Sequence, residues 1–397
     1  MHLALVIDDY LPDSTRVGAK MFHELAVELT HLGHNVTVIT PGFEQKHAFR
    51  ETQLDKVKIW NFRSSPIKDI GKIQRAINET VLSHRAWSAI KHRIKGDTFD
   101  GVVYYSPSIF FGGLVSKIKQ RCACRSYLIL RDFFPQWAID SGLINAGSMI
   151  ERYFRYFEKR NYSAANVIGV MSQKNLEVFG KQSPCYSGKS EILRNWASLK
   201  PSEEVYDIRK KLSLENHIIF FYGGNIGHAQ DMANLMRLAK GMNDYQLAHF
   251  LFIGQGDEVE LIKQLAEQWQ LSNFTFLPSV GQDAFKKILA EIDIGLFSLS
   301  KKHTAHNFPG KLLGYMVEAK PILGSINKGN DLKEVINSNS AGYILDNGED
   351  QSLLNSAIKL YEDQEERMEL GLNSQKLLEN EFSVSSAANL IVKGLRS

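Results

Sequence analysis

The sequence predicts an α/β protein made of two Rossmann-like domains, each with a doubly wound parallel sheet. Apolar segments of strand length alternate with amphipathic segments of helical length along the chain, which is the pattern of βαβ units. The chain opens with such a unit, in which residues 2–8 and 35–40 are strands and residues 16–31 are the helix. The alternation pauses near residues 195–216 and then resumes. A length of 397 residues is enough for two or three domains.

The bulk composition is that of an ordinary soluble protein, with 44% hydrophobic and 23% charged residues. No run approaches the roughly 18 apolar residues that span a bilayer. The opening MHLALVIDDY indicates a first strand rather than a signal peptide. Cys122, Cys124 and Cys185 give neither a disulfide framework nor a zinc-binding spacing. We therefore expect a cytoplasmic protein with reduced cysteines.

The first predicted domain comprises residues 1–198. The loop after its first strand is Asp8-Asp9-Tyr10-Leu11-Pro12, where a dinucleotide-binding fingerprint would need glycines. This argues against NAD and FAD. Beyond the opening unit, strands are expected at 99–105, 126–130 and 166–171, and helices at 72–95 and 148–162.

The second predicted domain comprises residues 199–381, after the linker-like Pro201-Ser202-Glu203-Glu204. The last helix, 382–397, is expected to pack back on the first domain. Two doubly wound domains of similar size would place a ligand cleft between them, at the C-terminal ends of the strands. Strands of the second domain are expected at 217–222, 250–253, 274–277, 292–297, 321–323 and 343–345.

The stretch from Asn307 to Met316 has the character of an anion site. It lies between two apolar runs, and we expect a loop followed by a helix. Pro309 suits a first helical turn, and Gly310 allows close approach to the backbone. Lys311 would stand in that turn, where a cation opposes the helix dipole unless an anion is held there. A surface lysine on a crossover helix is an equally weighted alternative from this stretch alone.

Three further loops follow strands and precede helices. Loop 12–20 carries Gly18 beside the cation Arg16, although a plain helix N-cap is the simpler interpretation of its serine and threonine. Loops 222–230 and 253–257 are rich in glycine, which permits close approach of a ligand. All three loops are expected to face the cleft.

His303 and His306 are a histidine pair that could suggest a metal. No further Cys, His or carboxylate lies at a spacing that would complete a ligand set. We therefore expect no metal site.

Charge is unevenly distributed along the chain. Residues 1–200 contain 28 Lys+Arg and 18 Asp+Glu, whereas the remainder contains 19 and 26. The basic half suggests an anionic partner, either nucleic acid or an anionic membrane surface. The basic amphipathic stretch 72–95 is weighed equally between an interfacial helix and a core helix, and core packing is favoured for 148–162.

Six segments of the chain, taken in order, carry a resemblance to a known family. They are the opening VIDDYLPDSTRVGAKMFHELAVELTHLGHNVTVIT, RDFFPQW at 131–137, FYGGNIGHAQDM at 221–232, FIGQGD at 252–257, LAEIDIGLFSL at 289–299 and FPGKLLGYMVEAKPIL at 308–323. Together they resemble the family-4 glycosyltransferases, which are retaining nucleotide-sugar enzymes of GT-B fold. The resemblance covers nearly the whole chain and is nearest to the WbuB-type L-fucosamine transferases of bacterial O-antigen and capsule synthesis.

The resemblance implies transfer of a sugar from a UDP-sugar, expected to be an N-acetylamino sugar such as N-acetyl-L-fucosamine, with retention at the anomeric carbon. Such chemistry needs a stabilised leaving diphosphate and a well-placed acceptor oxygen, and no cofactor or metal is implied. The implied partners are the UDP-sugar, an undecaprenyl-diphosphate-linked saccharide acceptor and an anionic membrane surface bound through the basic first domain, not nucleic acid. The protein would then associate peripherally with the inner face of the cell membrane.

The resemblance also implies roles for individual residues. Catalytic roles fall on Asp132, His306 and Lys311. Acceptor-binding roles fall on Arg16, Arg131 and Phe134. Donor-binding roles fall on Gly18, Gly223, Gly224, Asn225, Gly227, Gln230, Gly254, Gly256, Asn307, Phe308, Pro309, Gly310 and Glu318.

The sequence departs from the family pattern at two places. The family's Glu-x7-Glu motif falls on His306 and Gly314, so the glutamate that holds the ribose is missing, and Glu318 is the expected substitute. Where the family often has Arg and Lys after the first strand of the second domain, this chain has Asn225 and Gln230. Lys311 is therefore left as the local cation.

Two other functions stay open. A non-hydrolysing sugar-nucleotide 2-epimerase shares the two-domain architecture, but it needs several acid–base groups and only Asp132, His303 and His306 are visible. The loss of both glutamates also permits a catalytically silent sugar-nucleotide-binding subunit.

Overall fold

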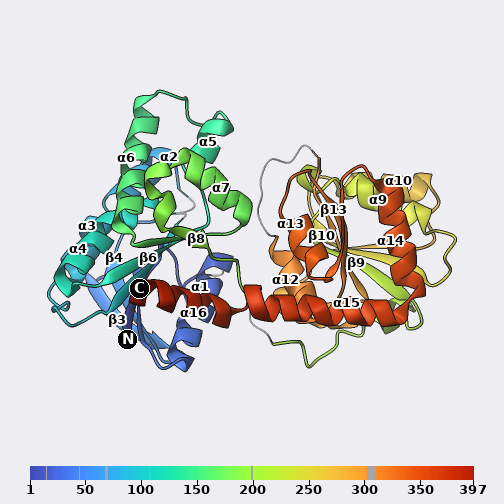
Figure 1. Cartoon of the computed structure of the whole chain (residues 1–397), viewed down its shortest axis with the longest axis horizontal. Coiled ribbons are helices and arrows are strands. Elements are labelled where there is room, and N and C mark those ends of the chain that lie inside the picture. The colour runs from blue at the N-terminus through green and yellow to red at the C-terminus, as the bar shows by residue number, and fades with distance from the viewer. Residues whose placement is uncertain (15, 44, 68–69, 107, 198–199, 302–308) are drawn as a thin grey trace. The chain divides into compact units, whose positions relative to one another are not determined.

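The computed structural model describes residues 1–397 except 15, 44, 68–69, 107, 198–199 and 302–308. The chain forms two compact units (Figure 1). Unit 1 comprises Met1–Arg194 and Val384–Ser397, and unit 2 comprises Asn195–Ser383. We expected the boundary after residue 198 and the return helix from 382. Each unit is a largely parallel sheet between layers of helices, so the predicted α/β class is confirmed.

Unit 1 contains an eight-stranded sheet in the described part of the chain, with the order β3-β4-β2-β1-β5-β6-β7-β8. All neighbouring strands are parallel except the antiparallel pair β3–β4. The chain reverses its direction of travel across the sheet between β1 and β5, so the crevice where such sheets bind ligands lies beyond these two strands. The strands are β1 His2–Val6, β2 Asn35–Gly42, β3 Phe49–Leu54, β4 Val57–Arg63, β5 Gly101–Ser106, β6 Arg125–Leu130, β7 Val167–Val170 and β8 Ser190–Ile192.

Helices α1 and α16 cover one face of this sheet, and α3, α4 and α6 cover the other. A Cβ added to Gly101 would lie 2.9 Å from Leu395 Cδ1, which shows how closely the C-terminal helix packs on β5. The helical elements of unit 1 are α1 Val17–His31, α2 Lys72–Thr80, α3 Leu82–Ile90, η1 Ile109–Phe111, α4 Gly112–Cys122, α5 Gln136–Asp140, α6 Met149–Ala164, α7 Gln173–Gln182, η2 Pro184–Lys189 and α16 Val384–Arg396.

The hairpin β3–β4 was missed by the sequence analysis. Its two-residue turn is Asp55-Lys56, and both residues have left-handed φ values of 47° and 66°, as a tight hairpin requires. Neither position is glycine, and most side chains of β3 are exposed and polar. No apolar run or turn signature therefore marked this edge of the sheet.

The two amphipathic stretches of unit 1 behave differently from expectation. The stretch 72–95 is not one helix, because it breaks at Val81 into α2 and α3. Leu82 and Ile90 of α3 are buried, so this half belongs to the core. The N-terminal half of α6, which we expected to pack in the core, exposes most of its large apolar side chains instead.

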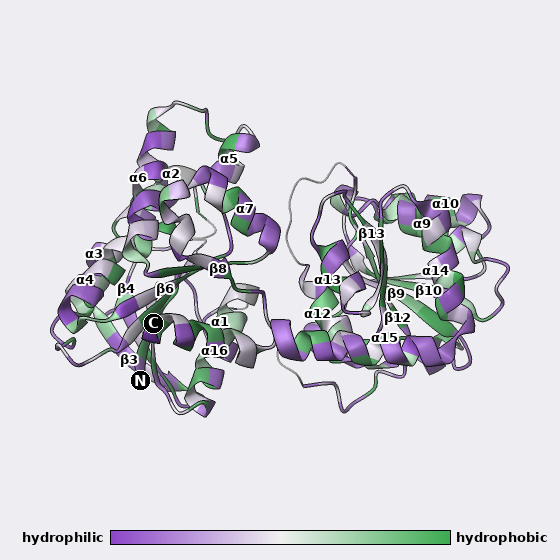
Figure 2. Cartoon of the chain, viewed as in Figure 1, coloured by the Kyte–Doolittle hydropathy of each residue, from purple (hydrophilic) through white to green (hydrophobic). Residues whose placement is uncertain are grey.

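Unit 2 contains a sheet with the order β11-β10-β9-β12-β13-β14, and all its neighbouring pairs are parallel. In order of appearance this is 3-2-1-4-5-6, so its switch point lies between β9 and β12. Figure 2 shows hydrophobic colouring along β9 and β12, whose side chains join cores on both faces of the sheet. The strands are β9 Ile218–Asn225, β10 Ala248–Gln255, β11 Phe274–Pro278, β12 Ile294–Ser298, β13 Ile322–Ile326 and β14 Gly342–Asp346.

The helices of unit 2 fall on the two faces of this sheet. Helices α9 and α14 pack together on one face, whereas α12 packs with α11 and α15 on the other. The helical elements are α8 Ile208–Leu212, η3 His228–Gln230, α9 Met232–Gly241, α10 Val259–Gln268, α11 Gln282–Glu291, α12 Gly310–Val317, α13 Leu332–Ser338, α14 Asp350–Glu362, α15 Gln364–Leu377 and η4 Leu378–Phe382.

Candidate active site

Lys311 is a buried cation at the switch point of unit 2. Its helix begins at Gly310 after the N-cap residue Pro309, which confirms the predicted helix. The Lys311 Nζ atom lies 3.8 Å from the centre of the Tyr222 ring and 3.6 Å from the place where a Cβ of Gly224 would stand. It is closed off from solvent and has no hydrogen-bond partner within the described ranges of the chain.

This environment disfavours the positive charge of Lys311. Burial lowers the pKa of its ammonium group to about 7, because a charge taken out of water without hydrogen bonds is costly. An anion placed beside the Nζ atom would reverse that cost. The first-turn N–H groups of α12 lack partners within their own helix, as at every helix start, and favour the same negative charge.

Most of the glycines predicted to bind the donor are required by the protein's own packing. A Cβ at Gly223 would lie 2.5 Å from the ring of Phe285. A Cβ at Gly254 would collide with the carbonyl oxygen of Gly224, and one at Gly256 with a carbonyl of the loop after β9. These glycines therefore let β9, β10 and α11 approach one another closely at the C-terminal ends of the two strands.

Gly224 differs from these three glycines, because Lys311 lies on its open side. Its φ of +118° is strained for any other residue, and a Cβ there would meet only the end of the lysine side chain. Beyond it, the Asn225 amide donates to Gln230 Oε1 over 2.8 Å. A Cβ at Gly227 would lie 2.9 Å from Asn225 Nδ2, so this loop is closed on itself.

A histidine–carboxylate pair that links the loop after β9 to the loop after β10 was missed by the sequence analysis. His228 Nδ1 lies 2.6 Å from Glu258 Oε1. The other oxygen of Glu258 accepts from the backbone N–H of Met232 at the start of α9, over 3.2 Å. Glu258 is buried, whereas the His228 ring is largely exposed. The two residues stand 30 positions apart on separate loops, so no local spacing signals the pair.

Glu318 does not lie with Lys311. It is the C-cap residue of α12, at the opposite end of the helix, and its Oε1 accepts from the backbone N–H of Ser202 over 2.8 Å. A Cβ at Gly314 would lie 2.8 Å from Leu289 Cδ1. The place where a ribose-binding glutamate was expected is therefore already contacted by α11.

Several predicted residues lie outside the described ranges. His303, His306, Asn307 and Phe308 belong to segment 302–308. Within the described residues, no group of three or more His, Cys, Asp or Glu side chains is arranged to hold a metal ion.

In unit 1, Gly18 lies in the first turn of α1 at the switch point. A Cβ there would touch the Tyr105 ring of β5 at 3.4 Å. Arg16 is the N-cap residue, and its Nε lies 3.5 Å from Asp9 Oδ2. Ser14 donates to the same oxygen over 2.8 Å, so it positions the loop rather than capping the helix as the simpler interpretation had it.

Arg131 is held by the protein's own backbone. Its Nη1 donates to the carbonyl of Leu193 over 2.6 Å, and its Nη2 donates to the carbonyl of Arg194 over 3.0 Å. Burial lowers the pKa of Arg131 to about 10, which leaves the guanidinium charged at neutral pH. The side chain ties the end of β6 to the chain leaving β8, and the structure gives no support to its predicted role in acceptor binding.

Asp132 directly follows that arginine and has the character of an acid–base group. Burial raises the pKa of its carboxyl to about 6, and a side-chain hydrogen bond from Trp137 partly offsets this effect. Phe134 packs its ring on Trp137 and Phe154, with centroids 6.0 Å and 4.8 Å apart. A carboxyl that titrates near neutrality can exchange a proton with a hydroxyl.

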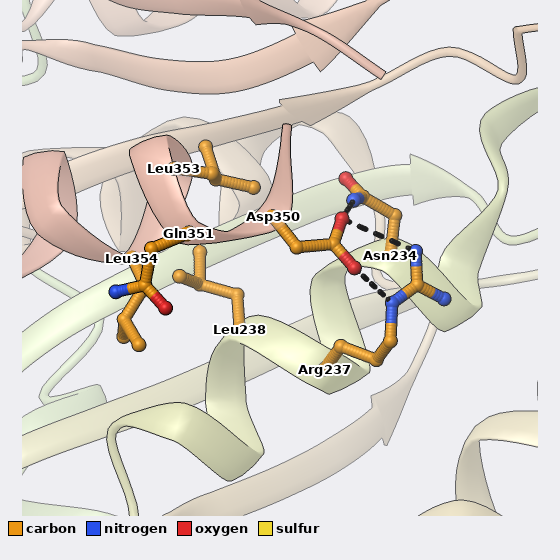
Figure 3. A pocket seen from close by; sticks show the side chains of 7 residues that line it. All are labelled: Asn234, Arg237, Leu238, Asp350, Gln351, Leu353 and Leu354. Carbon is orange, nitrogen blue, oxygen red and sulfur yellow. Dashed lines mark hydrogen bonds and ion pairs between the residues drawn. The ribbon is translucent and has the colours of Figure 1, made fainter. Parts of the chain in front are cut away.

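A small pocket between α9 and α14 is lined by Asn234, Arg237, Leu238, Asp350, Gln351, Leu353 and Leu354 (Figure 3). The guanidinium of Arg237 is paired with Asp350, with Nε 2.6 Å from Oδ2. Asn234 donates to the same carboxylate over 3.0 Å. Its polar groups therefore satisfy one another, and this pocket is not part of the candidate site.

Comparison with known proteins gives a consistent class. Residues 205–377, which include Lys311, match the model of the family described as glycosyl transferases group 1. The matched segment covers most of unit 2 and less than half of the chain, and the two-sheet architecture of the chain is the GT-B fold. The fold is shared with HepE from Anabaena in complex with UDP, at a TM-score of 0.68 and 14% identity over 100% of both chains.

Two curated relatives are similar in sequence. WbjE of Pseudomonas aeruginosa, named as a glycosyltransferase, is 24% identical over 54% of this chain and 54% of its own length. This chain thus spans about half the length of that relative. WcaI of Escherichia coli K12, named as a glycosyl transferase of colanic acid biosynthesis, is 23% identical over 77% of this chain and 78% of its own length.

No described helix is both long enough and apolar enough to cross a membrane.

Proposed function

We propose that this protein is a retaining glycosyltransferase that moves a sugar from a UDP-sugar to a lipid-diphosphate-linked saccharide in bacterial O-antigen or capsule synthesis. The observation that carries the proposal is the buried ammonium of Lys311, which has no hydrogen-bond partner in the described residues and stands at the start of α12. The group 1 match that includes it, the UDP complex of HepE and the similarity to the glycosyltransferases WbjE and WcaI support this assignment.

In this proposal the donor diphosphate binds beside Lys311 Nζ. The absence of a side chain at Gly224 lets Nζ lie close to the loop after β9, and the first turn of α12 adds backbone N–H donors. Charge builds up on the diphosphate as the sugar–oxygen bond breaks, so a desolvated cation held at that place stabilises the transition state. His228, oriented by Glu258, stands in the same loop region and would contact the donor from the side of β9.

Unit 1 would supply the acceptor end through Asp132. Its carboxylate would hold or deprotonate the attacking hydroxyl, which requires the ionised form. Because the pKa of Asp132 is about 6, kcat/KM is expected to fall as the pH drops below 6. We further propose an N-acetylamino sugar donor and a reaction without a divalent metal, in which Lys311 and α12 provide the positive charge.

The test is a panel of UDP-sugars with a short-chain lipid-diphosphate saccharide, with and without EDTA. Product mass identifies the sugar, and the anomeric coupling constant of the product shows whether configuration is retained. EDTA is expected to leave the rate unchanged. Epimerised UDP-sugar formed without acceptor would indicate the epimerase alternative, and UDP binding without any turnover would indicate a silent binding subunit.

A further inference from the structure

We propose that one apolar surface of unit 1 inserts into the interface of an anionic lipid bilayer. The surface lies on α5, on α6 and on the segment between them (Figures 1 and 2), and we call it the α5–α6 surface. It contains six of the twelve large hydrophobic residues that are exposed in the described chain, all within one stretch of twenty positions. Its members are Trp137 (46% exposed), Leu143 (63%), Met149 (77%), Ile150 (59%), Tyr153 (36%) and Tyr156 (59%).

Four of the six exposed residues belong to α6, a well-formed helix whose other side is packed. Ser148 caps the start of α6 by accepting from the N–H of Glu151 over 3.1 Å. Phe154 and Phe157 face inward and pack on Phe110, with ring centroids 6.4 Å and 4.8 Å apart. The fold therefore already has its aromatic core on this helix, and the outer apolar residues are not needed to complete it.

The charges around the surface favour a lipid headgroup layer. Arg155 pairs with both carboxylates of α6, at 3.4 Å from Glu151 and 2.9 Å from Glu158. Exposed charges on α6 are then all cationic, and they are Arg152, Lys159 and Arg160. Between Trp137 and Arg160 the single exposed carboxylate is Asp140 on α5.

A bilayer is the occupant that fits both properties. Trp and Tyr favour the boundary between headgroups and acyl chains, Met and Ile favour the region beneath, and Arg and Lys favour anionic phosphates. A second copy of this chain would bring the same cations against one another.

The surface also adjoins the predicted acceptor end of the site. Trp137, one of its members, donates its backbone N–H to the carbonyl of Phe133, the residue after Asp132, over 3.2 Å, and its side chain lowers the pKa of the Asp132 carboxyl. A saccharide anchored by a lipid under this surface would therefore emerge beside Asp132. The purpose of the surface rests on the proposed lipid-linked acceptor, but the membrane contact itself can be measured without any transfer reaction.

The experiment is flotation of the full chain with vesicles of phosphatidylcholine alone and of equal parts phosphatidylcholine and phosphatidylglycerol. The test variant is M149S/I150S, and the matched control is M368S/L372S, whose residues are 60% and 53% exposed on α15 of unit 2. The wild type is expected to bind the anionic vesicles more tightly than the neutral ones. The test variant is expected to lose at least about tenfold in partitioning, equivalent to about 1.4 kcal/mol, whereas the control pair retains wild-type binding.

Equal thermal melting curves would show that the variants are folded. Transfer to a water-soluble acceptor should be unchanged in M149S/I150S, since neither residue belongs to the candidate site. Vesicle binding that survives the test variant, or that is lost equally in both variants, would overturn the proposal. So would a wild-type dimer that M149S/I150S dissociates without any vesicle binding. Vesicle binding with no transfer from any UDP-sugar would leave this inference standing while the proposed function fails.

Discussion

Each unit holds a buried cation near the C-terminal edge of its sheet, and the two cations are in opposite states. In unit 1, Arg131 donates hydrogen bonds to the backbone carbonyls of Leu193 and Arg194. In unit 2, the Lys311 ammonium has an aromatic ring beside it but no hydrogen-bond partner in the described residues. Both were predicted to bind ligands, Lys311 from its place in the first turn of a helix and from the family resemblance, and Arg131 from the resemblance alone.

The difference shows how a cation that stabilises the fold can be told from a cation that binds a ligand. Arg131 stabilises the native chain because its charge is satisfied when the protein is empty. Lys311 destabilises the empty protein, since burial disfavours its charged form, and can recover that free energy only from a ligand. The hydrogen-bond partners that each cation has in the empty protein, and not its position in the sequence, therefore distinguish a structural role from a ligand-binding role.

The largest effect is expected from K311M. Removing the cation should lower kcat by about 10²–10³-fold, the range found when one transition-state donor is lost. The same change should raise the melting temperature at pH 7, because an unsatisfied buried charge is replaced by an apolar side chain of similar length. Steady-state kinetics and calorimetry would measure the two opposite changes. A stability loss together with intact kinetics would place Lys311 in the same class as Arg131.

R131M should have the converse outcome. It leaves two backbone carbonyls without their donors and should destabilise the protein by about 2–4 kcal/mol. UDP affinity, which belongs to unit 2 in our proposal, should not change. Urea unfolding and calorimetric titration with UDP would test this. A specific loss of acceptor affinity with normal stability would restore the original acceptor-binding prediction.

UDP binding should weaken as the pH rises above 7. The pKa of Lys311 is about 7 in the empty protein, and an adjacent diphosphate would raise it, so binding above pH 7 must include the uptake of a proton. The affinity for UDP should then be highest below pH 7 and should fall by up to about tenfold per pH unit above it. Titration calorimetry in two buffers of different ionisation enthalpy would count the proton. K311M serves as the control and should show no such uptake.

The smallest effect is expected from E318Q. The backbone N–H of Ser202 can still bond the amide oxygen, so the loss of stability should stay below about 1 kcal/mol. UDP affinity should change by less than about twofold, because Glu318 lies at the far end of α12 from Lys311. A tenfold loss of affinity would instead support the substitute role in ribose binding that the sequence suggested.

The fold class was predictable because its signals are local. Apolar strands and amphipathic helices can each be recognised from a short stretch of sequence, and so can their alternation. The predicted strands of both units are accordingly present in the structure. The β3–β4 hairpin was not predictable, because its strand β3 is polar and its turn uses Asp55-Lys56 without glycine. The exposure of Met149 and Ile150 likewise depends on which face of α6 the rest of unit 1 covers. The spacing of apolar residues along the helix does not reveal which face that is.

The candidate site was predictable as a place but not as a set of contacts. Strand–loop–helix order located Lys311 and the loop after β9. The hydrogen bonds of Arg131 are made to carbonyls more than 60 residues away in the sequence. Local sequence therefore does not tell whether such a side chain is free to bind a ligand. The same holds for Glu318, which is bound by a linker residue 116 positions distant, and for the pair His228–Glu258.

The path of the chain has a consequence for synthesis. In the sequence, unit 2 is inserted between the two segments of unit 1. The chain entering unit 2 and the chain leaving it are paired where the Ala197 N–H donates to the Phe382 carbonyl over 2.9 Å. On the ribosome, unit 2 is complete once residue 383 has been made, whereas unit 1 still lacks α16. At about 5–20 residues per second, its first segment waits on the order of 10–40 seconds for that helix. During this interval Gly101 and Tyr127, which Leu395 and Gly394 later cover, remain open to chaperones, so the half of the protein that is made first is the last to be finished.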